Sequence, residues 1–512
     1  MFSTIISGAI CGMNVMLVHV EVDMAQGLPG FMMVGYLSGE VKEAGERVRV
    51  ALKNSGISIP PMRITVNLSP ADIRKEGTAF DLPVAVGMLL SLGYIENEAV
   101  SDIMIAGELS LDGKVNPIKG VLPLVRKAKE TGMKRCLVPE ENRNEGAVIS
   151  GVEVIGAATL KEALCYLKGE QEEKAPKKKP AGNKTKKREK APDFSEIGGQ
   201  TAAKRAVEIA AAGFHNLLLI GPPGSGKTMI AKRIPGILPP LTMDERLEVS
   251  SLYSISGLLG SEETFITRRP FMSPHHTATA RTLVGGGRIP RPGIASLAHK
   301  GVLFLDEMPE FGQHVLDMLR QPLEDKRINI ARIGGNYTYP ADFMLVGAMN
   351  PCPCGYYPDM NRCRCSLTDI KKYQSHISGP ILDRIDMCTE VSQVAMKELT
   401  QKIKGETSAS IRKRVIKARK RQEDRYGGKG YGYECNAGLT VKDIRKFCGL
   451  DEKELKLMER AFATLQLSAR GYYRILRVAR TIADLDESEK IKEIHLAEAL
   501  SYRMEGNKYW ER

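Results

Sequence analysis

An eight-residue loop near the middle of the chain constrains its fold more than any other feature. The loop matches the pattern G-x-x-x-x-G-K-[S/T], it follows the strand-like apolar run Leu217–Ile220, and a helix is expected from Met229 onward. Its glycines allow backbone N–H groups to converge on phosphate oxygens at a helix N-terminus. A chance glycine-rich turn is the alternative, but the flanking strand and helix argue against it. The loop consists of Gly221, Pro222, Pro223, Gly224, Ser225, Gly226, Lys227 and Thr228.

Two adjacent carboxylates are expected to complete this site. The apolar run Val302–Leu305 is followed directly by Asp306 and Glu307. We expect Asp306 and the Thr228 hydroxyl to hold Mg²⁺, and Lys227 to reach the β- and γ-phosphates of ATP. Glu307 suits the base that directs water at the γ-phosphate. Paired acids after a strand also occur as helix N-caps, but their position after a phosphate loop favours ATP hydrolysis.

Two polar residues farther along the chain are expected to act at a γ-phosphate, one in its own subunit and one in a neighbouring subunit. Asn350 follows the apolar strand Met344–Met349, where its amide can hold the attacking water. Arg384 suits an arginine supplied in trans to the γ-phosphate of a neighbouring subunit, which requires a ring. A surface arginine paired with Asp383 or Asp386 is the alternative.

A third candidate lies near the start of a C-terminal helix. Ser468 begins this helix, and Arg470 is the residue expected to contact the γ-phosphate as the helix is brought over the nucleotide. Arg474, one turn later, is the second candidate for the same role.

Apolar periodicity divides the chain into three folded blocks and one tether. Residues 1–167 alternate short β-rich runs with helical stretches, which indicates an α/β or α+β domain. Residues 168–192 are rich in lysine and nearly free of apolar side chains, as in a flexible linker. Residues 193–395 alternate strands and helices around near-continuous apolar runs, typical of a covered parallel sheet. Residues 396–512 are expected to be helical.

The chain is expected to remain in the cytoplasm, with no membrane partner. No basic segment precedes the apolar stretch within Met1–Val22, and no uninterrupted apolar run is long enough to cross a bilayer. In that compartment thiols are kept reduced, so the ten cysteines are not interpreted as disulfides.

Four of the cysteines form a C-x-C-x8-C-x-C pattern that suits a structural zinc site. Four reduced thiols in an ordered loop are the alternative. His275 and His276 are a second pair of potential ligands, but without a nearby acidic partner they are interpreted as part of a structural or DNA-facing insertion. The four cysteines are Cys352, Cys354, Cys363 and Cys365.

Two basic segments are candidates for contact with a nucleic-acid backbone. Arg327–Ile333 and Asn336–Tyr339, joined at Gly334-Gly335, predict a β-hairpin, and Arg332 near its tip is expected to touch DNA phosphates without sequence preference. The formal net charge of +13 supports a polyanionic partner, although the linker supplies part of it. The helix Ser410–Arg425 is basic almost all round, and a solvated surface and a DNA contact are equally consistent with it.

The sequence resembles the magnesium-chelatase-like AAA+ ATPases of the bacterial YifB/ComM family over nearly its whole length. The resemblance implies an AAA+ core with a parallel sheet, a C-terminal helical lid, a hexameric ring, and ATP with Mg²⁺ as cofactors. It also implies branch migration of single-stranded or branched DNA during integration of transforming DNA. The segments that carry it are Arg269–Phe271, Pro274–Thr277, Leu283–Gly287, Leu297–His299, Asn350–Gly355 and Ser468–Tyr472.

The N-terminal block is similar to the proteolytic domain of Lon proteases. The similarity is carried by Arg74–Gly77, Gly113–Gly120 and Val138–Asn142. Lon-type peptidases use a serine activated by a lysine, and these positions align with Ala79 and Leu122. Alanine offers no nucleophile and leucine no base, so this α+β domain is expected to be a scaffold and not a peptidase.

Two other functions remain open at this point. A motor subunit that drives metal insertion into a tetrapyrrole would use the same ATPase, but it is expected to lack a Lon-like domain. An ATPase that remodels protein partners, without contacting DNA, is the other alternative.

Overall fold

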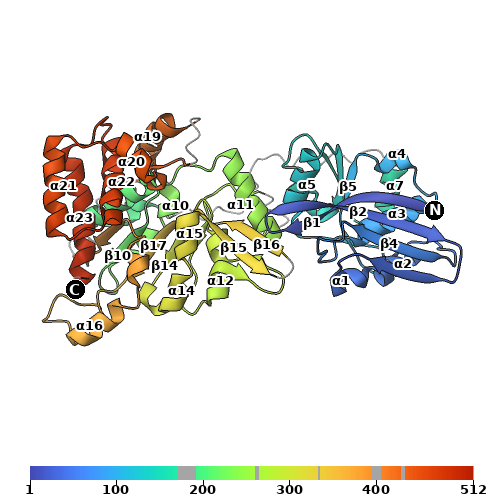
Figure 1. Cartoon of the computed structure of the whole chain (residues 1–512), viewed down its shortest axis with the longest axis horizontal. Coiled ribbons are helices and arrows are strands. Elements are labelled where there is room, and N and C mark those ends of the chain that lie inside the picture. The colour runs from blue at the N-terminus through green and yellow to red at the C-terminus, as the bar shows by residue number, and fades with distance from the viewer. Residues whose placement is uncertain (171–191, 260–264, 333–334, 394–404, 428–432, 511–512) are drawn as a thin grey trace.

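The computed structural model describes residues 1–170, 192–259, 265–332, 335–393, 405–427 and 433–510. Most of the predicted linker, the hairpin residues Ile333 and Gly334, and the glycine-rich segment 428–432 lie outside the described residues. The molecule is elongated, with the N-terminal block at one end, the nucleotide-binding core in the middle and the C-terminal helices at the other end (Figure 1).

The N-terminal block is built on a seven-stranded mixed sheet in the order β3-β4-β2-β1-β5-β8-β9. Its first two strands form a long antiparallel hairpin that turns at Gly12, where φ is 64°. The strands are β1 (Phe2–Cys11), β2 (Asn14–Ala25), β3 (Gly30–Val34), β4 (Arg63–Ser69), β5 (Ile103–Ile105), β8 (Arg135–Pro139) and β9 (Glu153–Ala157).

One helix of this block is buried along its whole length. All eleven residues of α3 (Asp81–Ser91) are inaccessible to solvent, and the helix packs against β1 and β2. Each fully buried Leu or Val there contributes roughly 1.5–3 kcal/mol. The other helices are α1 (Gly39–Lys42), α2 (Ala44–Asn54), α4 (Asn97–Val100), α5 (Val121–Glu130), α6 (Arg143–Gly146) and α7 (Leu160–Leu167), and a small ribbon pairs β6 (Glu108–Leu109) with β7 (Val115–Asn116).

The core is a five-stranded parallel sheet in the order β11-β14-β17-β10-β18. Every residue of β10, β14 and β17 is buried, which confirms the covered parallel sheet. We call the edge at which these strands end the carboxyl edge, and the edge at which they begin the amino edge. The strands are β10 (Leu217–Ile220), β11 (Phe271–Met272), β14 (Val302–Leu305), β17 (Met344–Met349) and β18 (Met387–Glu390).

Helices and two small ribbons surround this sheet. The longer helices are α8 (Thr201–Gly213), α11 (Met243–Ser256) and α16 (Leu367–Gln374), and the short ones are α9 (Lys227–Ala231), α10 (Ile234–Ile237), α12 (Ala280–Val284), α13 (Ile294–Leu297), α14 (Gln313–Asp317), α15 (Arg320–Asp325) and α17 (Gly379–Leu382). The predicted hairpin is formed by β15 (Arg327–Arg332) and β16 (Gly335–Pro340), and a second ribbon pairs β12 (Gly285–Gly286) with β13 (Arg291–Pro292).

The N-terminal block packs directly on this core. Gly120 N–H at the start of α5 donates to Ser254 O on α11 at 3.1 Å, and the Ser254 hydroxyl donates to Glu145. The tip of the β1–β2 hairpin lies against β16, since a Cβ added at Gly12 would be 3.2 Å from Thr338 O (Figure 1). The Lon-like block therefore supports the side of the predicted DNA hairpin.

The C-terminal helices share one apolar core with α8 of the ATPase core. Asn436 lies at the centre of a buried polar network, where it accepts from the Tyr426 hydroxyl at 2.7 Å and donates to Asp484 at 2.9 Å. The helices are α19 (Ser408–Tyr426), α20 (Val441–Phe447), α21 (Glu452–Thr464), α22 (Ala469–Leu485) and α23 (Glu493–Trp510). This confirms the helical C-terminal region.

Several basic side chains of helix α19 form ion pairs or hydrogen bonds within the chain. Arg414 pairs with Glu208 and Glu406, and the Lys417 ammonium binds Glu487. Arg419 donates to Ala211 O at 3.2 Å and Arg421 to Glu487 O at 2.9 Å. These partners lie on α8 and after α22, so α19 is a strut between the core and the lid. Within the described residues, no helix is long and apolar enough to cross a membrane.

Candidate functional site

The phosphate loop connects β10 to α9 at the carboxyl edge. Gly224 and Gly226 have φ of 73° and 93°, a region that favours glycine, and Gly226 caps the first turn of α9. Gly221 is required for another reason, because a Cβ there would lie 2.2 Å from Val391 O. The loop thus has the strand–loop–helix context that the sequence predicted.

Lys227 is folded back onto its own loop. Its side-chain nitrogen donates to Gly221 O at 2.7 Å, to Pro222 O at 3.0 Å and to the Asn350 Oδ1 at 3.1 Å. Burial lowers the pKa of Lys227 to about 8, although Asp306 and Glu307 act in the opposite direction. A phosphate group entering the loop would replace these neutral acceptors with negatively charged oxygens.

The hydroxyl and carboxylate predicted to hold Mg²⁺ lie together. The Thr228 hydroxyl at the start of α9 donates to Asp306 Oδ2 at 2.6 Å, across from the end of β14. Asp306 Oδ1 accepts from the Glu307 N–H at 3.0 Å, which fixes the orientation of the carboxylate. Hard oxygen donors of this kind suit Mg²⁺, which takes one or two protein ligands and completes its shell with phosphate and water.

Glu307 has an unexpected partner. Its Oε2 lies 3.4 Å from the Nδ1 of His276, and its side chain is 58% exposed. Glu307 also adopts a left-handed backbone with φ of 50°, a strained state typical of functional residues. Sequence analysis found no acidic partner for the two histidines, because this carboxylate lies 31 positions away in the chain. His275, stacked on His276 at 4.1 Å, contacts the Thr277 hydroxyl instead.

Arg384 lies at the amino edge, away from its own phosphate loop. Its backbone carbonyl accepts from the Asn216 side chain at 2.8 Å, and Asn216 immediately precedes β10. Its guanidinium donates to Pro380 O at 2.6 Å and pairs with Glu324 on α15. The structure therefore does not pair Arg384 with Asp383 or Asp386, which was the alternative.

The two candidate arginines of α22 differ in their surroundings. Arg470 is 65% exposed, and its guanidinium lies 3.9 Å from Glu324, the same carboxylate that Arg384 binds. Arg474 is 14% exposed, faces Asp386 at 3.6 Å and donates to Ile385 O. Arg470 is thus the accessible arginine, and Arg474 holds α22 to the core.

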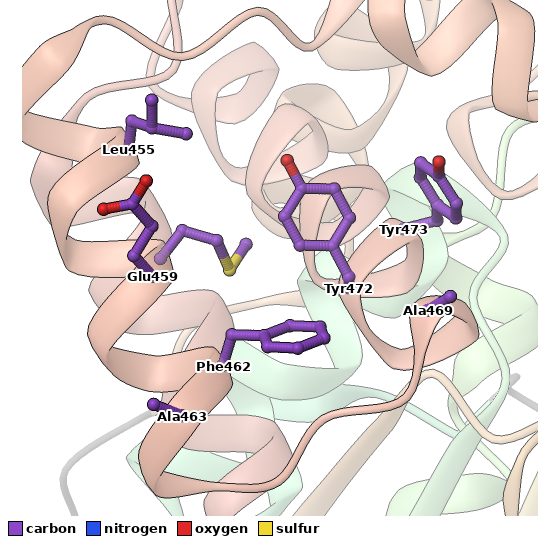
Figure 2. Close-up of a pocket in the computed structure, with 8 residues that line it drawn as sticks. Leu455, Glu459, Phe462, Ala463, Ala469, Tyr472 and Tyr473 are labelled. Carbon is purple, nitrogen blue, oxygen red and sulfur yellow. The ribbon is translucent and has the colours of Figure 1, made fainter.

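An apolar pocket of about 390 Å³ lies beside Arg470, between α21 and α22. The rings of Phe462 and Tyr472 face one another across it, with their centroids 6.4 Å apart (Figure 2). The pocket contains none of the residues predicted to contact ATP. It is lined by Leu455, Met458, Glu459, Phe462, Ala463, Ala469, Tyr472 and Tyr473.

The four cysteines of the C-x-C-x8-C-x-C pattern are brought together. Their sulfur atoms all lie within 4.8 Å of one another, so the cluster can hold a metal ion.

The two residues that align with the serine and lysine of Lon-type peptidases, Ala79 and Leu122, carry neither a nucleophile nor a base. Ala79 donates no proton and Leu122 is fully buried on α5, while the aliphatic part of Lys119 packs on Gly257 at the end of α11.

Three partners of the predicted site residues were not foreseen from the sequence. His276 contacts Glu307, Glu324 binds Arg384, and the Gln200 side chain donates to Ser225 O of the phosphate loop at 3.3 Å. Each comes from a segment far away in the chain. The Asp-Glu pair itself offered no signal that would identify these partners.

Comparisons with known proteins agree with this architecture. Family models of the magnesium chelatase subunit ChlI match residues 20–142 and 193–399, and a model of the C-terminal part of that subunit matches residues 405–503. Lon protease 2 of Bacillus subtilis is 31% identical over 124 residues, which cover 24% of this chain and 22% of the protease.

Two relatives match along nearly their whole length. Competence protein ComM of Haemophilus influenzae is 43% identical over 505 residues, covering 97% of this chain and 96% of the relative. The uncharacterized protein YifB of Escherichia coli is 41% identical over 496 residues, with the same coverage of 97% and 96%. With its parallel sheet, phosphate loop and helical C-terminal region, the chain belongs to the ComM/YifB family of magnesium-chelatase-like AAA+ ATPases.

Proposed function

We propose that this ATPase motor forms a ring, probes DNA with its β15–β16 hairpin, and uses ATP hydrolysis for branch migration in recombination or in the integration of transforming DNA. The observation that carries the proposal is a basic surface made jointly by the hairpin and the neighbouring β12–β13 ribbon. Arg332 Nε donates to Gly287 O at 3.2 Å, which joins the two. The exposed arginines of this surface are Arg281, Arg288, Arg291 and Arg332.

Arginines of this kind bind phosphates without reading bases. Each phosphate that they neutralise releases counterions, so affinity falls steeply as salt rises. A motor that moves along DNA needs sequence-independent contacts of this type. Part of the surface is close to Glu76 of the Lon-like block, which faces Arg288. The N-terminal block is therefore proposed to limit where DNA reaches the hairpin, and not to cleave peptides.

The hydrolytic half of the proposal uses the residues at the carboxyl edge. Lys227 would bind the β- and γ-phosphates in place of its loop carbonyls, and Thr228 and Asp306 would hold Mg²⁺, which when bound would supply positive charge beside the phosphoryl group. Glu307 accepts a proton from the water that attacks the γ-phosphate, and Asn350 orients that water. These roles fit the contacts of the five side chains in the nucleotide-free chain.

The ring follows from the position of the arginines. Arg384 stands beyond the start of β10 and the phosphate loop follows its end, so they are separated by roughly 13 Å, the length of a four-residue strand. Arg470 shares Glu324 with Arg384 on that side of the core. Both arginines are thus proposed to serve the γ-phosphate of a neighbouring subunit, and a closed ring, hexameric as the family resemblance implies, gives every site its partner.

The proposal is tested by the effect of DNA on ATP hydrolysis. We expect forked DNA to stimulate the ATPase and the protein to move a Holliday-type junction, and we expect Arg332→Ala to lose most of the stimulation. Arg49→Ala, which removes an exposed arginine of α2, is the matched control. If no DNA stimulates the ATPase and no junction moves, the protein acts on another substrate, either as a magnesium-insertion motor or as a protein-remodelling ATPase.

A further inference from the structure

The cysteine cluster has the dimensions of a metal site. The Cys352 sulfur lies 3.4 Å from that of Cys354 and 3.8 Å from that of Cys363, and the Cys354 and Cys363 sulfurs are 3.6 Å apart. A tetrahedral ion with bonds of about 2.3 Å to sulfur requires sulfur atoms about 3.8 Å apart. A disulfide would require about 2.05 Å. The spacing therefore suits four thiolates around one ion.

Backbone N–H groups around the cluster donate hydrogen bonds to a cysteine sulfur. Gly355 N–H donates to Cys352 Sγ at 3.2 Å, and Tyr357 N–H donates to the same sulfur at 3.4 Å. Hydrogen bonds of this kind are the outer contacts that orient a ligand in metal sites.

The segment that carries the cysteines has little else to hold it. Residues 351–365, all of which the structure describes, form neither helix nor strand. Their apolar core consists of Cys352 and Cys363 with Ile370 of α16. A unit this small rarely buries enough apolar surface to be ordered by itself. A bound ion would crosslink it, and folding energy would then come from the metal.

This segment packs directly against the phosphate loop. A Cβ added at Gly355 would be 2.4 Å from Cδ of Pro223, so the two backbones are in close contact at a residue with φ of 85°. At its start the segment is held by Gln374, whose side chain donates to Pro351 O at 3.0 Å. The preceding residue is Asn350, which accepts from Lys227. The cysteine segment thus touches the loop at Pro223 and contacts its lysine through Asn350.

We propose that the four cysteines hold one structural Zn²⁺, and that the zinc-bound segment braces the phosphate loop so that metal occupancy sets the affinity for ATP. Sulfur ligands in a tetrahedron favour zinc over Mg²⁺, Ca²⁺ or Mn²⁺, which prefer oxygen. The four cysteines bind as thiolates and release their protons on metal binding. The inference rests on Gly221–Thr228 as the ATP site and is independent of DNA as the substrate.

Metal content tests the site itself. We expect one zinc per full-length chain by atomic emission, a loss of that zinc in Cys363→Ser and in Cys365→Ser, and its retention in Cys165→Ser, a free and partly exposed cysteine on α7. Replacement by Co²⁺ should produce the strong sulfur-to-cobalt absorption and intense visible bands of tetrahedral thiolate ligation. A metal-free protein, a disulfide, or iron with inorganic sulfide would each overturn the site.

Binding of a fluorescent ATP analogue tests the brace. We expect metal loss in Cys363→Ser to weaken binding at least about tenfold, which corresponds to about 1.4 kcal/mol of binding free energy. Gly355→Ala keeps all four cysteines and should keep the zinc, yet it should weaken binding by pushing the segment off Pro223. Gly56→Ala, at φ of 83° where a Cβ meets nothing within 4 Å, is its control because it imposes the same backbone strain away from the phosphate loop.

The two variants keep the test decisive if a cysteine substitution prevents folding, because Gly355→Ala leaves the cluster intact. Unchanged ATP affinity in zinc-loaded Gly355→Ala and in folded, zinc-free Cys363→Ser would show that the segment does not brace the loop. Loss of DNA stimulation with normal ATP binding would instead count against the proposed function and leave the zinc brace standing.

Discussion

The two edges of the core sheet carry different halves of the proposed catalytic apparatus. At the carboxyl edge Lys227 binds Asn350 and Thr228 binds Asp306, so four side chains from three strands already meet within one subunit. At the amino edge Arg384 and Arg470 share Glu324 and have no phosphate-binding loop beside them. In the proposed ring, the carboxyl edge supplies its residues from one subunit, whereas the arginines of the amino edge act on the nucleotide of a facing subunit.

The difference follows from how parallel strands are arranged. Loops that follow parallel strands meet at a single edge, so motifs at the strand ends converge whatever the rest of the fold does. Arginines at the opposite edge project away from that point. A ring turns this separation into regulation, because hydrolysis then depends on contact with a neighbour. The experiments below separate the two edges.

Removal of Arg384 should give the largest effect. Arg384→Ala is expected to lower kcat about a thousandfold, the lower end of the range for arginines that act on a γ-phosphate in trans. Binding of ATP to the isolated subunit should be almost unchanged, because Arg384 lies far from the phosphate loop in its own chain. Steady-state hydrolysis and analogue binding measure the two quantities. A large loss of binding would place the arginine in its own site.

Removal of the base at the other edge should cost slightly less. Glu307→Gln is expected to lower kcat at least about a hundredfold, since general bases contribute that much or more. The amide keeps the size of the side chain, so ATP binding should be retained. Retained hydrolysis would show that another group activates water.

Mixing these two inactive variants provides the sharpest comparison. In a mixed ring, Arg384 from a Glu307→Gln subunit can face an intact carboxyl edge on an Arg384→Ala subunit. With random assembly roughly a quarter of the interfaces have both intact halves, so about a quarter of the activity should return. Two variants of Glu307 mixed together form the control and should remain inactive. An inactive mixture of Arg384→Ala and Glu307→Gln would contradict action in trans.

The arginines of α22 should separate catalysis from stability. Arg470→Ala is expected to lower kcat about tenfold, because one charge-assisted hydrogen bond to phosphate is lost from an exposed side chain. Arg474→Ala removes the partner of buried Asp386 and should lower the free energy of unfolding. Hydrolysis rates and chemical denaturation of both variants measure this. Equal decreases in kcat, together with equal free energies of unfolding, would mean that Arg474 also contacts the γ-phosphate.

The smallest expected effect is on acid stability. Burial by itself would raise the pKa of Asp386, but His215 and Arg474 hold that pKa below its usual value. A lowered folded-state pKa stabilises the fold above the unfolded pKa of about 3.9, and the contribution is lost as pH falls below it. Asp386→Asn should therefore be less stable at neutral pH and show a shallower loss below pH of about 4. Denaturation curves between neutral and acid pH measure the slope, and an unchanged slope would contradict it.

Local motifs allowed most of the carboxyl edge to be predicted. The glycines, Lys227, Thr228 and the Asp306-Glu307 pair are consecutive or directly follow apolar strands, so their convergence needed no knowledge of packing. The cysteine pattern could also be recognised in the sequence, because the four cysteines lie within fourteen residues of chain. The contact of Gly355 with Pro223 was not, since it joins two loops from different strands.

Contacts between distant segments account for what was missed. His276 and Glu307 are 31 positions apart, and neither residue type indicates the other. The charges of α19 suggested a solvated or DNA-binding surface, but Glu208 on α8 and Glu487 after α22 pair with two of them, Arg414 and Lys417. A charge pattern describes a helix in isolation, whereas tertiary packing determines which residues its charged side chains contact.

The sequence by itself determined the ATP-binding chemistry, the parallel core sheet, the similarity of the N-terminal block to Lon proteases and the family. Each of these rests on residues close together in the chain or on the periodicity of apolar side chains, which local backbone physics decides. Only the tertiary structure decided that Arg384 and Arg470 lie at the amino edge, that His276 contacts the catalytic carboxylate, and that the cysteine segment leans on the phosphate loop. These depend on how long-range packing orients one element against another, and no single segment contains that information.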